Sequence, residues 1–126
     1  MDEIKIVVPG RPVAKARPRI GYAGRKVMLY TPEETVEYER RVHTFGRLAM
    51  QGRELVRGLV VVTMRLYFAR RARKSLPDTD NVVKAILDGL SGAVYVDDQQ
   101  VARIVAERFI DRDERAEIVV EEVEYG

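Results

Sequence analysis

Residues 59–68 constrain the fold most strongly, because hydrophobic side chains recur there at every second position. Five apolar side chains fall on one side of the extended chain: Val60, Val62, Met64, Leu66 and Phe68. Strict alternation of this kind is typical of a β-strand with one face buried against a core. The segment therefore predicts a strand in a sheet whose one face is covered.

Three other segments have the composition of strands: residues 4–8, 101–110 and 116–123. Only the polar turn 111–114 separates the last two, and so short a connection is typical of an antiparallel pair. Residues 20–30 predict a short hairpin around Gly24. The preceding residues 11–19 are rich in proline and predict an extended loop.

Two segments predict helices. The first begins at Thr31, which is expected to cap it in a capping box with Glu34, and it extends to about Gly52. The second is expected from near Asp80 to near Gly92. Together these elements predict one α+β domain over residues 1–126, with a mixed or antiparallel sheet and the two main helices packed on one face.

Composition narrows the classes of function. The chain of 126 residues has no cysteine, which excludes a disulfide scaffold, a thiolate zinc site and a cysteine nucleophile. It has no apolar run long enough to span a bilayer, and its first residues are acidic, unlike those of a signal peptide. We therefore expect a soluble cytoplasmic protein with no membrane partner and no organic cofactor. His43, the only histidine, is expected to serve packing or surface structure.

The net charge of +2 conceals an uneven distribution. Residues 1–30 hold seven basic and two acidic side chains, whereas residues 107–126 hold eight acidic and three basic ones. Separated cationic clusters are the electrostatic pattern of a surface that binds a polyanion. The side chains expected to contact DNA come from two basic segments: Lys15, Arg17 and Arg19, and then Arg70, Arg71, Arg73 and Lys74.

The aspartates between residues 78 and 98 carry the most chemical information. Asp78 and Asp80 are two residues apart just before a helix, so both carboxylates can point to the same side of the chain. Four-residue spacing then places Lys84 and Asp88 on the helix face of Asp80.

Asp97 and Asp98 follow after a short connection, and one of the two is expected to join Asp78 and Asp80; the sequence leaves open which. Three carboxylates with no cysteine or histidine nearby suit a hard divalent cation, Mg²⁺ or its substitute Mn²⁺. Neighbouring polar side chains are expected to orient these ligands: Asn81, Asp88 and Gln100.

Each of these features also has a structural explanation. Asp80 can act as a helix cap, Asp80 and Lys84 as an ordinary pair four residues apart, and Asp97 with Asp98 as a turn. An EF-hand calcium loop is excluded because Val83 stands where its glycine would be. A phosphate-binding P-loop is excluded because the segment from Gly10 to Lys15 lacks the second glycine and the following hydroxyl residue.

Taken together, these residues resemble the RusA family of Holliday junction resolvases, which are endodeoxyribonucleases of bacteria and their phages. The resemblance covers nearly the whole chain and rests on three motifs: Asp78-Thr79-Asp80-Asn81-Val82-Val83-Lys84, Asp88-Gly89-Leu90 and Tyr95-Val96-Asp97-Asp98-Gln99-Gln100-Val101. It implies a RusA-like fold and a Mg²⁺-dependent homodimer that resolves four-way junctions by paired symmetric cuts. It further implies that Asp78, Asp80 and Asp98 are essential catalytic carboxylates and that Lys84 is required.

Two other functions share the same residues. A less selective Mg²⁺ nuclease would cut flaps and other branched DNA, and a non-catalytic DNA-binding module would use its acidic cluster only for structure. Tyr22, beside the basic loop, is a candidate for the wedge that opens a branch point.

Overall fold

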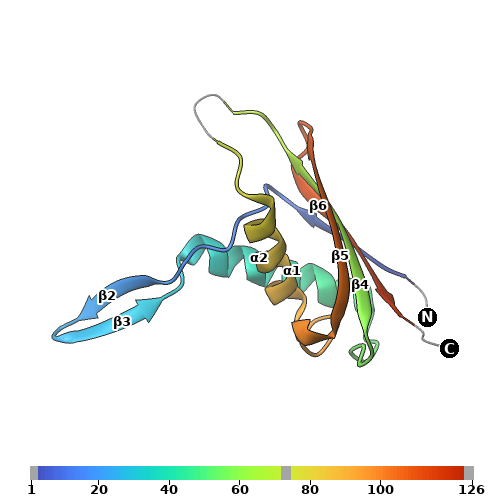
Figure 1. The fold of residues 1–126 in the computed structure, drawn as a ribbon, viewed down its shortest axis with the longest axis horizontal. Helices are drawn as coiled ribbons and strands as arrows, with labels where there is room; N and C mark the ends of the chain where they lie inside the picture. The colour runs from blue at the N-terminus through green and yellow to red at the C-terminus, as the bar shows by residue number, and fades with distance from the viewer. Residues whose placement is uncertain (1–2, 72–74, 124–126) are drawn as a thin grey trace.

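The computed structural model describes residues 3–71 and 75–123 and has β4 (Val60–Phe68) near the middle of a four-stranded sheet. The five alternating apolar side chains of β4 are all buried, which confirms the pattern read from the sequence. The sheet order is β1 (Ile4–Pro9), β6 (Arg115–Glu122), β4 and β5 (Val101–Ile110). Both helices cover the same face of this sheet, so the α+β prediction is confirmed (Figure 1).

The expected pairing of the last two strands is wrong. β6 pairs with β4 antiparallel, and β5 pairs with the other edge of β4 in parallel, so β4 lies between them. The turn 111–114 therefore passes over the end of β4, where the Asp111 N–H donates to the Phe68 carbonyl at 3.0 Å. In this arrangement β4 has hydrogen-bonded neighbours on both of its edges, so the backbone groups of this apolar strand are paired on both sides.

The two helices begin and end close to the expected residues. α1 (Glu33–Met50) starts after Pro32, and no side-chain cap hydrogen bond is present, so the predicted Thr31 cap is wrong. Pro32 itself takes the cap position with extended backbone, and its carbonyl accepts from the N–H groups of Thr35 and Val36. α2 (Thr79–Leu90) matches its prediction, and a short 3₁₀ helix, η1 (Asp98–Gln100), precedes β5.

The core lies between the sheet and the helices. α1 contributes Tyr38 and Val42, and α2 contributes Ile86 and Leu90, all of them at most 1% exposed. Burying a side chain of this size stabilises a fold by about 1.5–3 kcal/mol relative to leaving it in water. Because the apolar face of each helix is used in this way, its polar face is left on the surface.

β2 (Arg19–Ala23) and β3 (Lys26–Tyr30) form a separate two-stranded sheet, which confirms the predicted hairpin. It projects away from the sheet and helices as an arm (Figure 1). We refer to residues 19–30 as the arm. Among the described residues, no helix is both long and apolar enough to cross a membrane.

Gly89 allows the two helices to approach closely. A Cβ at this position would lie 2.7 Å from the Val42 Cβ and 2.8 Å from the Glu39 carbonyl oxygen of α1. The carbonyl oxygen of Gly89 itself lies 3.2 Å from Nδ1 of His43, so the one histidine lies at this helix contact. A side chain at position 89 would therefore meet backbone that cannot move without separating the helices.

We predict that Gly89→Ala destabilises the protein by about 1–3 kcal/mol, although alanine is the better helix former by about 1 kcal/mol. Urea unfolding followed by circular dichroism measures the change. Gly46→Ala is the matched control, because its Cβ would meet only side-chain atoms, the nearest at 3.2 Å on Val94, and it should cost less. Equal stability of the two variants would contradict the close helix contact.

Candidate functional site

The first turn of α2 presents two carboxylates to solvent. Asp78 occupies the cap position with extended backbone, yet its side chain makes no cap hydrogen bond, and Asp80 lies in the first turn. Both residues are exposed. Asp80 is thus not the helix cap, and neither carboxylate forms a capping hydrogen bond with the helix.

Two contacts from distant segments hold this end of α2 in place. Arg108 of β5 donates to the Pro77 carbonyl at 3.0 Å, and the Lys15 N–H donates to the Asn81 carbonyl at 2.8 Å. The Arg108 contact fixes the residue immediately before Asp78, a positioning role that no local sequence pattern indicates. Asn81, expected to orient ligands through its side chain, contributes this backbone contact.

One face of α2 carries Asp80, Lys84 and Asp88, as the four-residue spacing predicts, and all three are exposed. The opposite face is buried, with Val82, Val83 and Ile86 against the core. Within the described part of the chain, neither Asp80 nor Lys84 takes part in an ion pair. These two groups are therefore available to a ligand.

Tyr95 ties the following segment to the last turn of α2. Its ring is fully buried, and its hydroxyl donates to the Leu87 carbonyl at 2.8 Å. Burial raises the pKa of the Tyr95 hydroxyl, and the charges of Asp98 and Asp88 raise it further. The tyrosine thus stays neutral and acts as an anchor that brings the next residues beside α2.

Gln100 fixes the backbone around the paired aspartates. Its side-chain oxygen accepts from the N–H groups of Val96 and Asp97 at 2.8 and 2.9 Å. Its amide nitrogen donates to the carbonyls of Val56 and Gly58, at 2.8 and 2.9 Å. The residue expected to orient ligands therefore holds the backbone from which Asp97 and Asp98 extend.

Asp97 and Asp98 differ in their surroundings. The Asp97 carboxylate accepts from the Gln99 N–H at 3.0 Å, and this bond lowers the pKa of Asp97. The pKa of Asp98 is raised, first by a hydrogen bond shared with Asp97, then by slight burial and by repulsion from the charges of Asp97 and Asp88. Asp97 is thus engaged in the turn, whereas Asp98 is in no ion pair within residues 3–71 and 75–123.

The structure brings these aspartates together only in part. Asp98 lies near Asp88, and Asp80 lies eight residues earlier on α2, a separation of about 12 Å along the helix axis. Among residues 3–71 and 75–123, no three histidine or acidic side chains are grouped closely enough to hold a metal ion. The chemistry of the donors nevertheless fits a hard divalent cation, because Asp78, Asp80 and Asp98 are all exposed carboxylates.

The cationic residues expected to bind DNA fall into different environments. Arg17, Arg19 and Arg70 are exposed, whereas Arg73 and Lys74 lie outside the described residues. Arg71 forms an ion pair with Glu114, which also pairs with Arg11 at 2.6 Å and accepts from the Ala69 N–H at 3.0 Å. Burial opposes these contacts, but together they lower the pKa of Glu114.

Lys15 is held by the protein itself. Its ammonium lies 3.0 Å from carboxylate oxygens of both Glu39 on α1 and Asp88 on α2. Desolvation lowers its pKa, but the hydrogen bonds to Asp88 and Glu39 outweigh that effect and the pKa of Lys15 is raised. This lysine fastens the extended loop to both helices, in addition to any contact with DNA.

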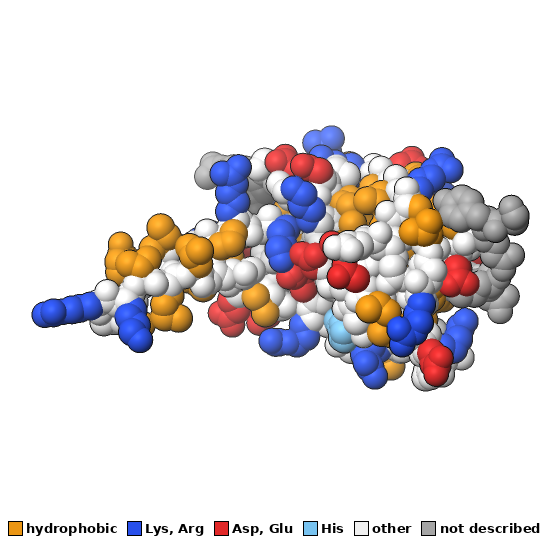
Figure 2. Space-filling view, turned by 60° about the horizontal axis from the view of Figure 1, so that its bottom comes forward, with side chains coloured by type: hydrophobic (Ala, Val, Ile, Leu, Met, Phe, Trp, Pro, Cys, Tyr) orange, Lys and Arg blue, Asp and Glu red, His pale blue; other side chains and the backbone are white. Residues whose placement is uncertain are grey.

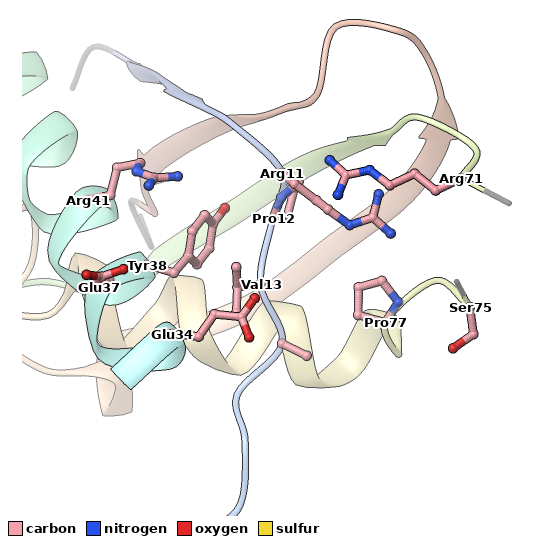
Figure 3. Close-up of a pocket in the computed structure, with 11 residues that line it drawn as sticks. Arg11, Pro12, Val13, Glu34, Glu37, Tyr38, Arg41, Arg71, Ser75 and Pro77 are labelled. Carbon is pink, nitrogen blue, oxygen red and sulfur yellow. The ribbon is translucent and has the colours of Figure 1, made fainter. Parts of the chain in front are cut away.

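A cavity of about 570 Å³ adjoins the start of α2. Figure 3 shows Arg41 and Tyr38 on α1, Arg11 on the segment after β1, and Pro77 just before Asp78, around this hollow. The Tyr38 hydroxyl is buried and has no hydrogen-bond partner among the described residues. The lining includes three arginines together with the acidic Glu34 and Glu37, so the cavity has mixed charge. It adjoins the exposed carboxylates of Asp78 and Asp80, which we call the acidic row.

Comparison with known proteins places these features in a family. The sequence profile described as endodeoxyribonuclease RusA matches residues 9–121, which include both helices and all the aspartates discussed above. The chain is also similar to the uncharacterised protein YqaN of Bacillus subtilis (strain 168). The two are 30% identical, and the match covers 98% of this chain and 99% of that protein.

We predict that Lys15→Met lowers the free energy of unfolding by about 1–3 kcal/mol, because the partly buried carboxylate of Glu39 and the exposed one of Asp88 lose the cation between them. Arg17→Met is the matched control, since Arg17 is exposed and in no ion pair within the described residues; its change should stay within about 0.5 kcal/mol. Urea unfolding at pH 7 measures both. Equal effects of the two substitutions would show that the Lys15 contacts do not anchor the loop.

Proposed function

This chain belongs to the RusA endodeoxyribonuclease family, and from that premise we propose that it is a Mg²⁺-dependent enzyme that resolves four-way DNA junctions. The observation that carries the proposal is the first turn of α2, where the carboxylates of Asp78 and Asp80 and, one turn on, the ammonium of Lys84 are all exposed. Asp98 adds a further exposed carboxylate near Asp88 on the same helix. A row of this composition suits hydrolysis of a phosphodiester, whose transition state gathers negative charge on its oxygens.

In this proposal the cation is held, once DNA is bound, by carboxylates at the start of α2 and before β5: Asp78, Asp80, Asp98 and, at the edge, Asp97. Because Asp98 lies near Asp88 in the free protein, joint binding requires the segment before β5 and the start of α2 to approach each other. When bound, Mg²⁺ supplies an acidified water and neutralises charge on the scissile phosphate. Of the two paired aspartates, Asp98 is the better ligand, because the Asp97 carboxylate already accepts a hydrogen bond in the turn. Asp88 is committed to Lys15 and helps instead to set the charge around the site.

Exposed cationic side chains would hold and orient the DNA. Lys84 lies one turn from Asp80 and is in no ion pair among the described residues, so its ammonium can contact the scissile phosphate or the departing oxygen. The exposed guanidinium groups of Arg17, Arg19 and Arg70 are free to contact sugar-phosphate backbones at a distance from the cut. Such contacts position a duplex without reading its bases, so binding should weaken steeply with salt.

The proposal also includes a homodimer. A four-way junction has approximate two-fold symmetry, and a pair of identical subunits related by a two-fold axis would present one acidic row to each of two equivalent strands. Two matched cuts then follow from symmetry alone. The resulting duplexes would carry nicks that a ligase can seal.

We predict that Asp80→Asn reduces the cleavage rate of a synthetic four-way junction in Mg²⁺ by at least about 100-fold, because a metal ligand is lost. Junction affinity in EDTA should be retained or rise, since a negative charge near the phosphates is removed. Asp113→Asn is the matched control, because its side chain is 83% exposed in the turn after β5, and its cleavage rate should be normal. Near-normal cutting by Asp80→Asn would refute the assignment of the metal ligands.

Substrate choice and paired cutting are tested on a supercoiled plasmid that extrudes a cruciform. Two symmetric cuts within one binding event produce linear DNA, whereas single cuts produce nicked circles, so linear product should dominate from the earliest time points. The less selective nuclease predicts comparable rates on flap and junction oligonucleotides. The non-catalytic DNA-binding module predicts salt-sensitive binding with no cleavage in either Mg²⁺ or Mn²⁺.

A further inference from the structure

The arm has one face made only of apolar side chains. Register pairs Ile20 with Leu29 and Tyr22 with Val27, and alternation along each strand puts these four on the same side. Their exposed fractions are 61% for Ile20, 78% for Tyr22, 62% for Val27 and 72% for Leu29. No other part of the described chain combines four large apolar side chains at such exposure on one face.

Such a surface calls for a partner. An isolated two-stranded hairpin is marginally stable in water, and contiguous exposed apolar side chains usually mark a site of interaction. Figure 2 shows the arm extending from the body of the protein with hydrophobic side chains along it and basic side chains at its far end. The arm can thus reach a partner without any rearrangement of the core.

Charge identifies the chemistry of that partner as anionic. The opposite face of the arm carries Arg19 and Lys26 together with the exposed Met28 and Tyr30, and Arg25 lies at the turn. No acidic residue occurs from residue 4 to residue 32. A second copy of this chain would bring an equally cationic arm, and like charges facing each other oppose association. DNA suits both features of the arm. Its negative phosphates attract the basic side chains, and the flat faces of unstacked bases can pack against the apolar face.

The position of the arm connects it with the acidic row. The Lys15 N–H is bonded to the Asn81 carbonyl in the first turn of α2, and β2 begins four residues later at Arg19. Four residues span at most about 14 Å, so the base of the arm stays close to Asp78 and Asp80. DNA bound by the arm would therefore have its backbone near the carboxylates.

We propose that the arm enters the branch point of a DNA junction and places its apolar face against bases that are unstacked there, with Arg19, Arg25 and Lys26 toward phosphates. This proposal rests on the proposed function, because it assumes that branched DNA is the substrate. It assigns opening of the branch to a four-residue surface rather than to a single wedge at Tyr22.

The test uses a four-way junction with 2-aminopurine next to the branch point, because the fluorescence of this base rises when it unstacks. Measurements in EDTA keep binding separate from cleavage. Wild-type protein and the control Leu48→Ser, which changes an apolar residue on α1 that is 65% exposed, should both raise the fluorescence. The double variant Tyr22→Ser/Leu29→Ser should not raise it at saturating protein. Its junction affinity should fall about tenfold while its affinity for plain duplex is unchanged.

Several outcomes would overturn the proposal. A fluorescence rise with the double variant equal to that of wild type would show that the arm does not unstack the branch. Conversion of a wild-type dimer to a monomer by the same substitutions, seen by sedimentation equilibrium, would show that the apolar face binds a second copy instead. If circular dichroism shows that the double variant does not fold, Tyr22→Thr/Leu29→Thr replaces it with the same expected loss, because threonine suits a β-strand.

Failure of the arm and failure of the proposed function are distinguishable. If wild-type protein raises the fluorescence but never cuts in Mg²⁺, the proposed role of the arm stands and the proposed nuclease activity is refuted. If the protein cuts junctions without raising the fluorescence, the proposed role of the arm is refuted and the proposed nuclease activity stands.

Discussion

The packing of α2 on the sheet is the interaction on which the rest of this structure depends. Val82, Ile86 and Leu90 of α2 are completely buried. Gly89 lets α1 pack directly against α2, because any side chain at this position would clash with Val42 of α1. Once one side of a twelve-residue helix is fixed in this way, its other side must face solvent. The carboxylates and the lysine of α2 are therefore presented on a rigid support, which is what chemistry on a large polyanion requires.

Local periodicity in the sequence was enough to predict the strands, both helices and the common face of Asp80, Lys84 and Asp88. It was not enough to predict that β4 separates β5 from β6, because strand order depends on which backbone edges are satisfied across the whole sheet. The partners of Lys15 and Arg71 were missed for a related reason. Each is paired with an acidic residue at least 24 positions away, and a basic cluster gives no sign of such contacts.

Charge is balanced unevenly around the site. Lys15 compensates Asp88 and Glu39, whereas Asp98 is in no ion pair among the described residues. The pKa of Asp98 is raised by its hydrogen bond with Asp97, by slight burial and by the charges of Asp97 and Asp88. A protein that needed these aspartates only for a turn would gain nothing from leaving Asp98 without a cation. The uncompensated charge favours an external partner, and a divalent cation bound by oxygen ligands would relieve it.

The central claim is that carboxylates of α2 and of the segment before β5 bind a divalent cation together when DNA is present. Anomalous diffraction from crystals grown with Mn²⁺ and a non-cleavable four-way junction tests it most directly. The account predicts a manganese peak with oxygen ligands from Asp98 and from Asp78 or Asp80. A fully formed complex in which manganese is absent, or is bound by none of these residues, would contradict it.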